Sequence, residues 1–311
     1  MDPCRGAAWA VAWPASLALC AAAAERKDGQ QPPAAPVALK VLTWNIQYGS
    51  DRGADPNGWP ERQGLLRAAL ERERPAVLCV QEALAAQLEF LDRCLPGHAR
   101  EGAGRDDGKT KGEHCAVYWD GARFERLDGG TFWLSEAPEA PGRAWGEQYN
   151  RICTWVRLKD KPSGRVLRVF NTHLPLAPEA REKAARLVVK RLKGGAPGEP
   201  LILAGDFNSG PGSPAWKAFA EAGLVNTEKS AGKEPGTATY HKMGIGLVCL
   251  DAIFASDAWE VREHRVVSGA LKGAYPSDHF GVAAVLEWKE PSKTAPEGRA
   301  SPPPPPKPPD P

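Results

Sequence analysis

The sequence predicts an α/β protein in which packed β-sheets are flanked by helices. About ten short segments are apolar, and turn residues separate them. Only a few segments between these have the apolar spacing of a helix. A doubly wound parallel sheet needs a helix between successive strands, so the sequence does not favour that architecture.

The predicted strands are apolar runs bounded by turn or polar residues. Residues 76–80 and 201–204 are short and wholly apolar, which is typical of strands buried on both faces. In chain order, the predicted strands span residues 38–46, 76–80, 115–119, 124–134, 152–158, 166–170, 201–204, 247–254, 261–267 and 280–288.

Four segments have helical spacing. Residues 59–74 carry an apolar stripe, and this helix ends at Pro75 because proline disfavours a continuing helix. Residues 83–95 and 178–192 are helical by the same criterion. Residues 214–222 form a short predicted helix after a turn of Gly, Pro and Ser.

The two ends of the chain differ from the predicted domain at 38–288. Residues 1–24 resemble a cleaved export signal, since Arg5 precedes an apolar stretch that closes on small alanines. A lipid anchor at Cys20 and an uncleaved start are the alternatives. Residues 25–37 are predicted to be a polar linker, and the Pro-rich residues 289–311 an extended tail. We expect a secreted or periplasmic monomer without a transmembrane domain.

Composition narrows the choice of partners. A net charge of +2 does not indicate a strongly basic face for nucleic acid, although a local patch remains open. The cysteines after the signal show no CxxC or Cys/His spacing, so a zinc site is not favoured. A disulfide between Cys115 and Cys153 is conceivable if their strands are neighbours.

Polar residues occur where the predicted strands end, and this pattern recurs six times. Residues at one end of adjacent strands converge on one place, so together they indicate a functional site. Alternate residues of a strand also point the same way, so Asp206 and Asn208 are expected to reach one target. The strand-end residues are Asn45, Glu82, Asn171 with His173, Asp206 with Asn208, Asp251, and Asp278 with His279.

These residue types suit metal-assisted hydrolysis of a phosphate ester. Asn45, Glu82 and Asp278 offer the oxygen ligands that Mg²⁺ or Mn²⁺ prefers. Asp206 and Asn208 are expected to orient and deprotonate a water.

The histidines of this set are expected to contact phosphate. His279 would do so with Asp251 fixing its tautomer, and His173 would donate to a second phosphate oxygen. Each residue of the set could instead cap a turn or satisfy a buried backbone group. Arg105, His114, Arg151 and Asn171 are further candidates for substrate contacts, and Arg105 could equally be an exposed charge on a Gly/Asp-rich loop.

The order of the motifs resembles the endonuclease/exonuclease/phosphatase superfamily, which has a deoxyribonuclease-like fold, over residues 38–288. The motifs that carry the resemblance are Thr43-Trp44-Asn45, Gln81-Glu82, Asn171-Thr172-His173-Leu174, Gly205-Asp206-Phe207-Asn208, residues 250–254 and Ser277-Asp278-His279. Residues 104–109 and 130–135 look most like a bacterial branch that is often exported and is similar to the deadenylase-type members.

The resemblance implies a four-layer α/β/β/α sandwich of two packed mixed sheets with flanking helices. It also implies one site that depends on Mg²⁺ or Mn²⁺. The expected activity is that of an exported metal-dependent phosphohydrolase, and a phosphodiesterase is favoured over a monoesterase. Its substrate would be a nucleic acid, a phospholipid headgroup or a small phosphorylated metabolite. The alternatives are a phosphomonoesterase acting on sugar or inositol phosphates, and a catalytically silent binding module on the same scaffold.

Overall fold

The computed structural model describes residues 38–49, 58–242 and 247–290. The predicted export signal with Cys20, the linker at 25–37 and all but the first two residues of the Pro-rich tail lie outside the described residues, so these assignments stay predictions. Across the described ranges, no helix has both the length and the apolar character needed to cross a membrane.

Two mixed sheets of six strands each form the centre of the domain. The first sheet has the strand order β11-β12-β1-β2-β4-β3, and the second has β5-β6-β7-β8-β10-β9. Within each sheet one pair is parallel, β1 with β2 and β7 with β8, and the other neighbours are antiparallel. The strands of the first sheet are β1 (Leu39–Asn45), β2 (Val77–Ala83), β3 (His98–Glu101), β4 (His114–Asp120), β11 (Trp259–Val267) and β12 (Gly281–Trp288). Those of the second are β5 (Phe124–Trp133), β6 (Ile152–Asp160), β7 (Val166–His173), β8 (Leu201–Asp206), β9 (Val225–Asn226) and β10 (Asp251–Ala255).

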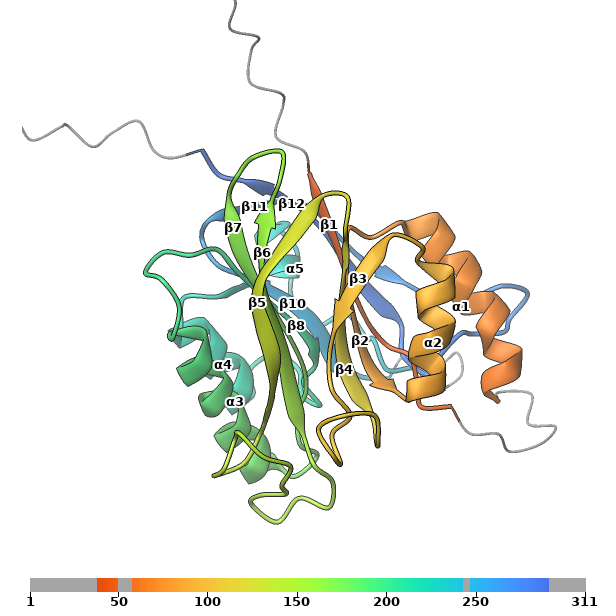
Figure 1. The fold of residues 1–311 in the computed structure, drawn as a ribbon, viewed down its shortest axis with the longest axis horizontal. Helices are drawn as coiled ribbons and strands as arrows, with labels where there is room; N and C mark the ends of the chain where they lie inside the picture. The colour runs from red at the N-terminus through yellow and green to blue at the C-terminus, as the bar shows by residue number, and fades with distance from the viewer. Residues whose placement is uncertain (1–37, 50–57, 243–246, 291–311) are drawn as a thin grey trace, which may run out of the picture. The chain divides into compact units, whose positions relative to one another are not determined.

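Helices cover the outer face of each sheet, which gives the four layers. The helices α1 (Trp59–Glu73) and α2 (Ala85–Cys94) pack on the first sheet, and α3 (Pro178–Leu192) and α4 (Pro214–Glu221) on the second (Figure 1). A short helix, α5 (Thr227–Ser230), follows β9. The predicted fold class, a sandwich of two mixed sheets with flanking helices, is therefore confirmed.

Strand alternation explains why polar residues end up between the sheets. Val41 on β1 and Ile202 with Ala204 on β8 belong to the core that the two sheets share. Because side chains alternate along a strand, Asn45 shares the inner face with Val41, and Asp206 shares it with Ala204. Both polar residues therefore lie at the edge of the space between the sheets, where the shared core ends.

Two predicted elements begin at least two residues later than expected. The predicted strand 247–254 begins only at Asp251, since residues before it leave the sheet and Val248 pairs with Tyr240 instead. Leu247 and Val248 are exposed, so their apolar character does not report sheet burial. The predicted helix 83–95 begins at Ala85, because β2 continues through Ala83.

The cysteines of the described residues are all free, including Cys115 and Cys153. The two lie on β4 and β6, which belong to different sheets, and both are buried. They serve as small apolar side chains rather than as a disulfide.

Candidate active site

Hydrogen bonds between side chains join the two sheets at the place where β1, β2 and β8 end. The amide nitrogen of Asn45, at the end of β1, donates to Oε1 of Glu82 at 2.8 Å and to Oδ2 of Asp206 at 3.0 Å. Asn45 is fully buried. The predicted convergence of β1, β2 and β8 is therefore present in the structure.

Glu82 reaches this site because β2 is irregular there. Simple alternation would place Glu82 on the outer face with Val80. The pairing of β2 with β4 shifts register between Val80 and Ala83, and Glu82 has a left-handed φ of 61°. Such a bulge turns a side chain toward a site at some cost in strain. The backbone N–H of Tyr48 holds the turned carboxylate, donating to Oε2 at 3.0 Å.

Asp206 is the most enclosed carboxylate that contacts Asn45. It ends β8, and Gly205 before it permits close approach to β7, since a Cβ at Gly205 would lie 2.0 Å from the carbonyl oxygen of Thr172. The backbone N–H of Asn208 donates to Oδ1 of Asp206 at 2.8 Å. Burial, together with the negative charge of Asp251, raises the pKa of Asp206 to about 7.

Asn208 contacts Asp206 through its backbone rather than through its side chain. Its Nδ2 donates to the carbonyl of Leu174 at 2.8 Å, and Arg181 donates to its carbonyl oxygen. Asn208 also has a left-handed φ of 48°. These bonds fix the turn after β8, and that turn presents the N–H which holds Asp206.

His279 and Asp251 form a buried pair beside Asp206. Nδ1 of His279 donates to Oδ2 of Asp251 at 2.8 Å, and Nε2 lies 3.9 Å from Oδ2 of Asp206. Burial alone would lower the pKa of His279, but Asp251, Asp206 and Asp278 outweigh it and raise that pKa to about 10. The imidazole is therefore cationic at neutral pH, with Nε2 facing the centre of the site.

His173, at the end of β7, has the opposite character. Burial, with the positive charge of Arg151, places its pKa well below the usual range. Its Nε2 lies 3.4 Å from Oδ2 of Asp206. Its Nδ1 is buried and has no hydrogen-bond partner within the described part of the chain. The site thus combines a neutral histidine with a cationic one.

Asp278 completes the acidic side of the site. Burial raises its pKa, and Glu82 adds to this effect through its charge. The hydroxyl of Ser277 donates to the carbonyl of Asn45 at 2.6 Å, which ties the Asp278 loop to the end of β1. Asp278 and Glu82 therefore lie close enough for their charges to interact.

The donor set fits a hard divalent cation. Ligand atoms of Glu82, His173 and Asp206 lie within 4.8 Å of one another. Those of Asp206, Asp251 and His279 are equally close, but the cationic imidazole of His279 offers no lone pair to a metal. The raised pKa values of Asp206 and Asp278 reflect buried negative charge that a cation would compensate. Carboxylate and amide oxygens are the donors that Mg²⁺ and Mn²⁺ prefer.

Two predicted substrate contacts are used inside the protein instead. The amide of Asn171 donates to the carbonyls of Val80 and Ala116 at 2.9 and 2.8 Å and accepts from Gln81 at 2.7 Å. It is fully buried and pins the two sheets together, so its N–H groups are not available to a substrate. His114 is also buried, with Nδ1 donating to the carbonyl of Ala83 at 3.0 Å.

Two residues that contribute to the site, Tyr240 and Arg62, carried no recognisable sequence signal. The ring of Tyr240 lies 5.1 Å from that of His279 between centroids. Arg62 on α1 donates to the carbonyls of Ile46 at 2.6 Å and Pro276 at 2.8 Å, bracing the loops that follow Asn45 and precede Asp278. Arg62 lies within an ordinary helical pattern, so nothing local distinguishes it from a surface arginine.

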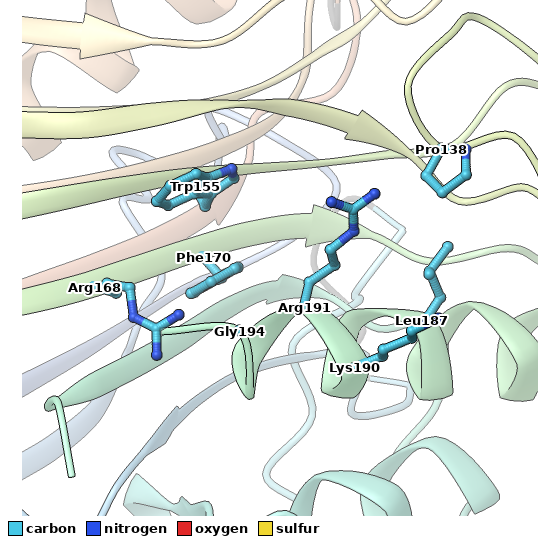
Figure 2. Close-up of a pocket in the computed structure, with 8 residues that line it drawn as sticks. All are labelled: Pro138, Trp155, Arg168, Phe170, Leu187, Lys190, Arg191 and Gly194. Atoms are coloured by element: carbon cyan, nitrogen blue, oxygen red, sulfur yellow. The ribbon is translucent and has the colours of Figure 1, made fainter. Parts of the chain in front are cut away.

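A separate cleft of about 450 Å³ lies on the outer face of the second sheet, beside α3. Figure 2 shows Trp155 and Phe170 on β6 and β7 facing this cleft, with Arg191 and Lys190 on the helix. Phe170 points away from the shared core, on the opposite face from Asn171 and His173. The cleft is therefore not part of the site described above.

Comparison with known proteins agrees with this geometry. The model of the Endonuclease/Exonuclease/phosphatase family matches residues 42–279, from β1 to His279. A mannosyl-6-phosphatase structure from Bacteroides thetaiotaomicron is 29% identical, with a TM-score of 0.73, and the match covers 80% of this chain and all of that one.

Two curated proteins are also similar to the chain. Nocturnin of Drosophila melanogaster is 24% identical over 319 residues, covering 83% of this chain and 48% of that protein. A "Probable RNA exonuclease" of Schizosaccharomyces pombe is 27% identical over 188 residues, covering 56% of this chain and 37% of that protein. The chain thus spans half or less of the length of these two relatives. Because the family match extends over most of the chain and includes every motif of the site, the chain belongs to the endonuclease/exonuclease/phosphatase family.

Proposed function

We propose that this site hydrolyses phosphate esters with the help of one bound divalent cation, Mg²⁺ or Mn²⁺. The observation that carries the proposal is the arrangement around Asp206. A buried carboxylate with a pKa of about 7 lies 3.9 Å from a histidine whose pKa is about 10. A buried carboxylate this close to a cationic histidine is placed to take a proton from an attacking water.

The residues of the site would have three roles: binding the cation, accepting a proton and stabilising negative charge. Glu82, Asn45 and Asp278 would hold the cation, which supplies charge stabilisation at a phosphoryl oxygen when bound. Oδ1 of Asn45 accepts from the backbone N–H of Gln47 at 3.0 Å. Presenting this oxygen to the cation would require the amide to turn and to give up its bonds to Gln47, Glu82 and Asp206, and contact with the cation would replace them. Asp206 accepts the proton of the attacking water. His279, kept cationic by Asp251, stabilises negative charge that develops on the phosphoryl group.

The ester class has two candidates. A diester is the expectation from the sequence, and the name of the Schizosaccharomyces pombe relative, a "Probable RNA exonuclease", is in keeping with it. A monoester is favoured by the likeness to a mannosyl-6-phosphatase, whose whole chain is covered by the match. The two classes share the site and the attack by water, and they differ in the number of charged oxygens on phosphorus.

The test is hydrolysis of p-nitrophenyl phosphate and of bis-p-nitrophenyl phosphate, with Mg²⁺, with Mn²⁺ and with a chelator. We expect metal-dependent release of nitrophenol that His279→Ala abolishes. His98→Ala is the matched control, since His98 lies on the edge strand β3 and contacts the carbonyl of Pro75 at 3.0 Å. Hydrolysis that survives both the chelator and His279→Ala would contradict the proposal.

A further inference from the structure

Arg151 is a buried cation whose side-chain donors are largely unpaired in the described part of the chain. It precedes β6 and is 5% exposed. Its Nε and Nη1 are buried without a hydrogen-bond partner, and no ion pair to it is found among the described residues. A buried guanidinium with unmade hydrogen bonds carries a large desolvation penalty, so a partner from outside the chain would relieve it.

Two neighbours present further unused groups to the same space. Nε of Arg105 is buried without a hydrogen-bond partner, as is Nδ1 of His173. Trp133 donates to the carbonyl of Arg105 at 2.7 Å, and so does Asn150 at 3.0 Å, which fixes the loop that carries this arginine. Arg105, Arg151 and His173 line one small pocket together with Glu82, Glu113 and Asn150.

Two guanidinium groups, of Arg105 and Arg151, and two carboxylates, of Glu82 and Glu113, line this pocket. Nη1 of Arg105 pairs with Oε2 of Glu113 at 2.6 Å, and the carboxylate of Asp106, on the solvent side, lies 3.9 Å from its Nε. Glu82 is engaged by Asn45 and Tyr48. The charge of Arg151 also acts on Glu113, where it lowers the pKa against the effect of burial. No hydrogen bond reaches Nε or Nη1 of Arg151 within the described residues, so these donors face the pocket unused, beside a residue that the proposed function assigns to the cation.

The size of the pocket limits what can enter. Its free volume of about 10 Å³ admits one water-sized group, such as a single oxygen atom. A second complete phosphate group would not fit. Since Glu82 and His173 belong to both the pocket and the active site, the oxygen that enters would belong to the phosphoryl group under attack.

We propose that Arg151, assisted by Arg105, binds a non-bridging oxygen of a terminal phosphoryl group, so that the site selects phosphate monoesters over diesters. This inference rests on the proposed function. In an in-line displacement, phosphorus carries three equatorial oxygens. In a monoester all three are charged and unsubstituted. In a diester one of them bears a carbon substituent. The cation, His279 and the Arg151 pocket would each hold one equatorial oxygen, so a diester, with only two unsubstituted oxygens, cannot fill all three places.

The reaction itself is ordinary hydrolysis. The water oxygen forms a bond to phosphorus as the bond from phosphorus to the leaving oxygen breaks. The proton of the water passes to Asp206, and the leaving oxygen takes a proton from solvent, which yields inorganic phosphate and an alcohol. Arg151 takes no part in proton transfer, and its role is to hold the phosphoryl group.

The test compares kcat/KM for p-nitrophenyl phosphate and bis-p-nitrophenyl phosphate at saturating metal. We expect the wild type to prefer the monoester, and Arg151→Gln to lose about 100-fold on the monoester with little change on the diester. Arg126→Gln is the matched control, because Arg126 on β5 is exposed and pairs with Glu101 at 2.7 Å. An equal loss on both esters, or a wild type that prefers the diester, would overturn the inference.

A second measurement separates this inference from the proposed function. Calorimetry of inorganic phosphate with the metal-free protein should show binding that Arg151→Gln weakens by about 10-fold. Equal phosphate binding by wild type and variant would overturn the inference. Hydrolysis of neither ester, with phosphate binding that Arg151→Gln still weakens, would contradict the proposed function but not the contact of Arg151 with a phosphate oxygen.

Arg151→Lys serves if the glutamine variant does not fold, because lysine keeps the charge. Its ammonium lacks the directed pair of N–H groups of a guanidinium, so we expect intermediate selectivity and intermediate phosphate affinity. Selectivity and affinity equal to those of the wild type would count against a role for the Arg151 guanidinium.

Discussion

Replacing Asp251 by asparagine tests how the site keeps His279 charged. The substitution preserves the shape of the side chain but removes its negative charge. In the wild type, the Oδ2 atom of this carboxylate accepts a hydrogen bond from Nδ1 of His279 at 2.8 Å. Asp251 is the largest influence raising the pKa of His279, and burial opposes it. Without that carboxylate, burial should bring the pKa of His279 back toward or below its usual value of 6.5.

The magnitude follows from the size of this shift. The pKa of His279 rises from 6.5 to about 10, and at about 1.4 kcal/mol per pKa unit this is a preference of about 5 kcal/mol for the charged form. Losing most of it would leave His279 neutral at pH 8. We expect kcat for a phosphate ester to fall by about 100- to 1,000-fold, the usual contribution of one group that stabilises developing negative charge.

The assay is the pH profile of kcat at saturating metal. A group with a raised pKa is charged below that value and loses its charge as pH rises through it. The wild-type rate should therefore persist until the pH approaches 10, and Asp251→Asn should lose its rate several pH units earlier.

The control for this profile is Asp160→Asn at the far end of β6, where the buried carboxylate pairs with Arg123 at 2.9 Å. An Asp251→Asn enzyme with the turnover and alkaline limb of the wild type would refute the reasoning.

Three further predictions concern metal affinity, packing and acid stability. Glu82→Gln should raise the Mn²⁺ concentration for half-maximal hydrolysis by about 10-fold or more, and an unchanged metal titration would remove Glu82 from the site. Asn171→Leu should lower the free energy of unfolding by about 2 to 5 kcal/mol in urea titrations, because it strands buried carbonyls and breaks the tie to Gln81. Glu73 is buried; burial would raise its pKa, but Arg265 outweighs this and lowers it. Glu73 therefore adds stability that is lost as pH falls through its lowered pKa. Glu73→Gln should lower the melting temperature at pH 7 and make the melting temperature fall less steeply as the pH is lowered. Curves of melting temperature against pH that run parallel for wild type and variant would contradict this.

The strands and the convergence of their ends could be predicted because both depend on local patterns. An apolar run that ends in Asp206 places the carboxylate on a definite face, since side chains alternate with a period of two. The same holds for Asn45 on β1. Such inferences need only the strand itself, and the structure places both residues on the inner face.

The features that the sequence did not predict depend on contacts between segments that are distant in the chain. The approach of Glu82 requires a bulge and a left-handed backbone, which no residue of the motif specifies. Asn171 follows an apolar run in the same way as Asn45, yet it lies within β7, two residues before the end of that strand. Its amide is therefore buried between the sheets, where it donates to two backbone carbonyls. The start of β10 depends on the hydroxyl of Thr239, which accepts from the N–H of Leu250 and of Asp251 at 3.0 Å.

Edge elements escaped prediction for a different reason. The strand β3 is only partly buried and has the sequence His-Ala-Arg-Glu, so it carries no apolar run. It is an edge strand that pairs only with β4 in the described sheet. A polar edge strand of this kind is common in native sheets, and its composition does not distinguish it from a loop.

The most direct test of the proposed active site is the turnover of Asp206→Asn at saturating Mn²⁺, with Mn²⁺ binding measured on the same preparation. If Asp206 takes the proton of the attacking water, kcat should fall by about 100- to 10,000-fold while the protein stays folded and still binds the ion. Turnover close to that of the wild type in a folded, metal-bound variant would contradict the assignment of this site.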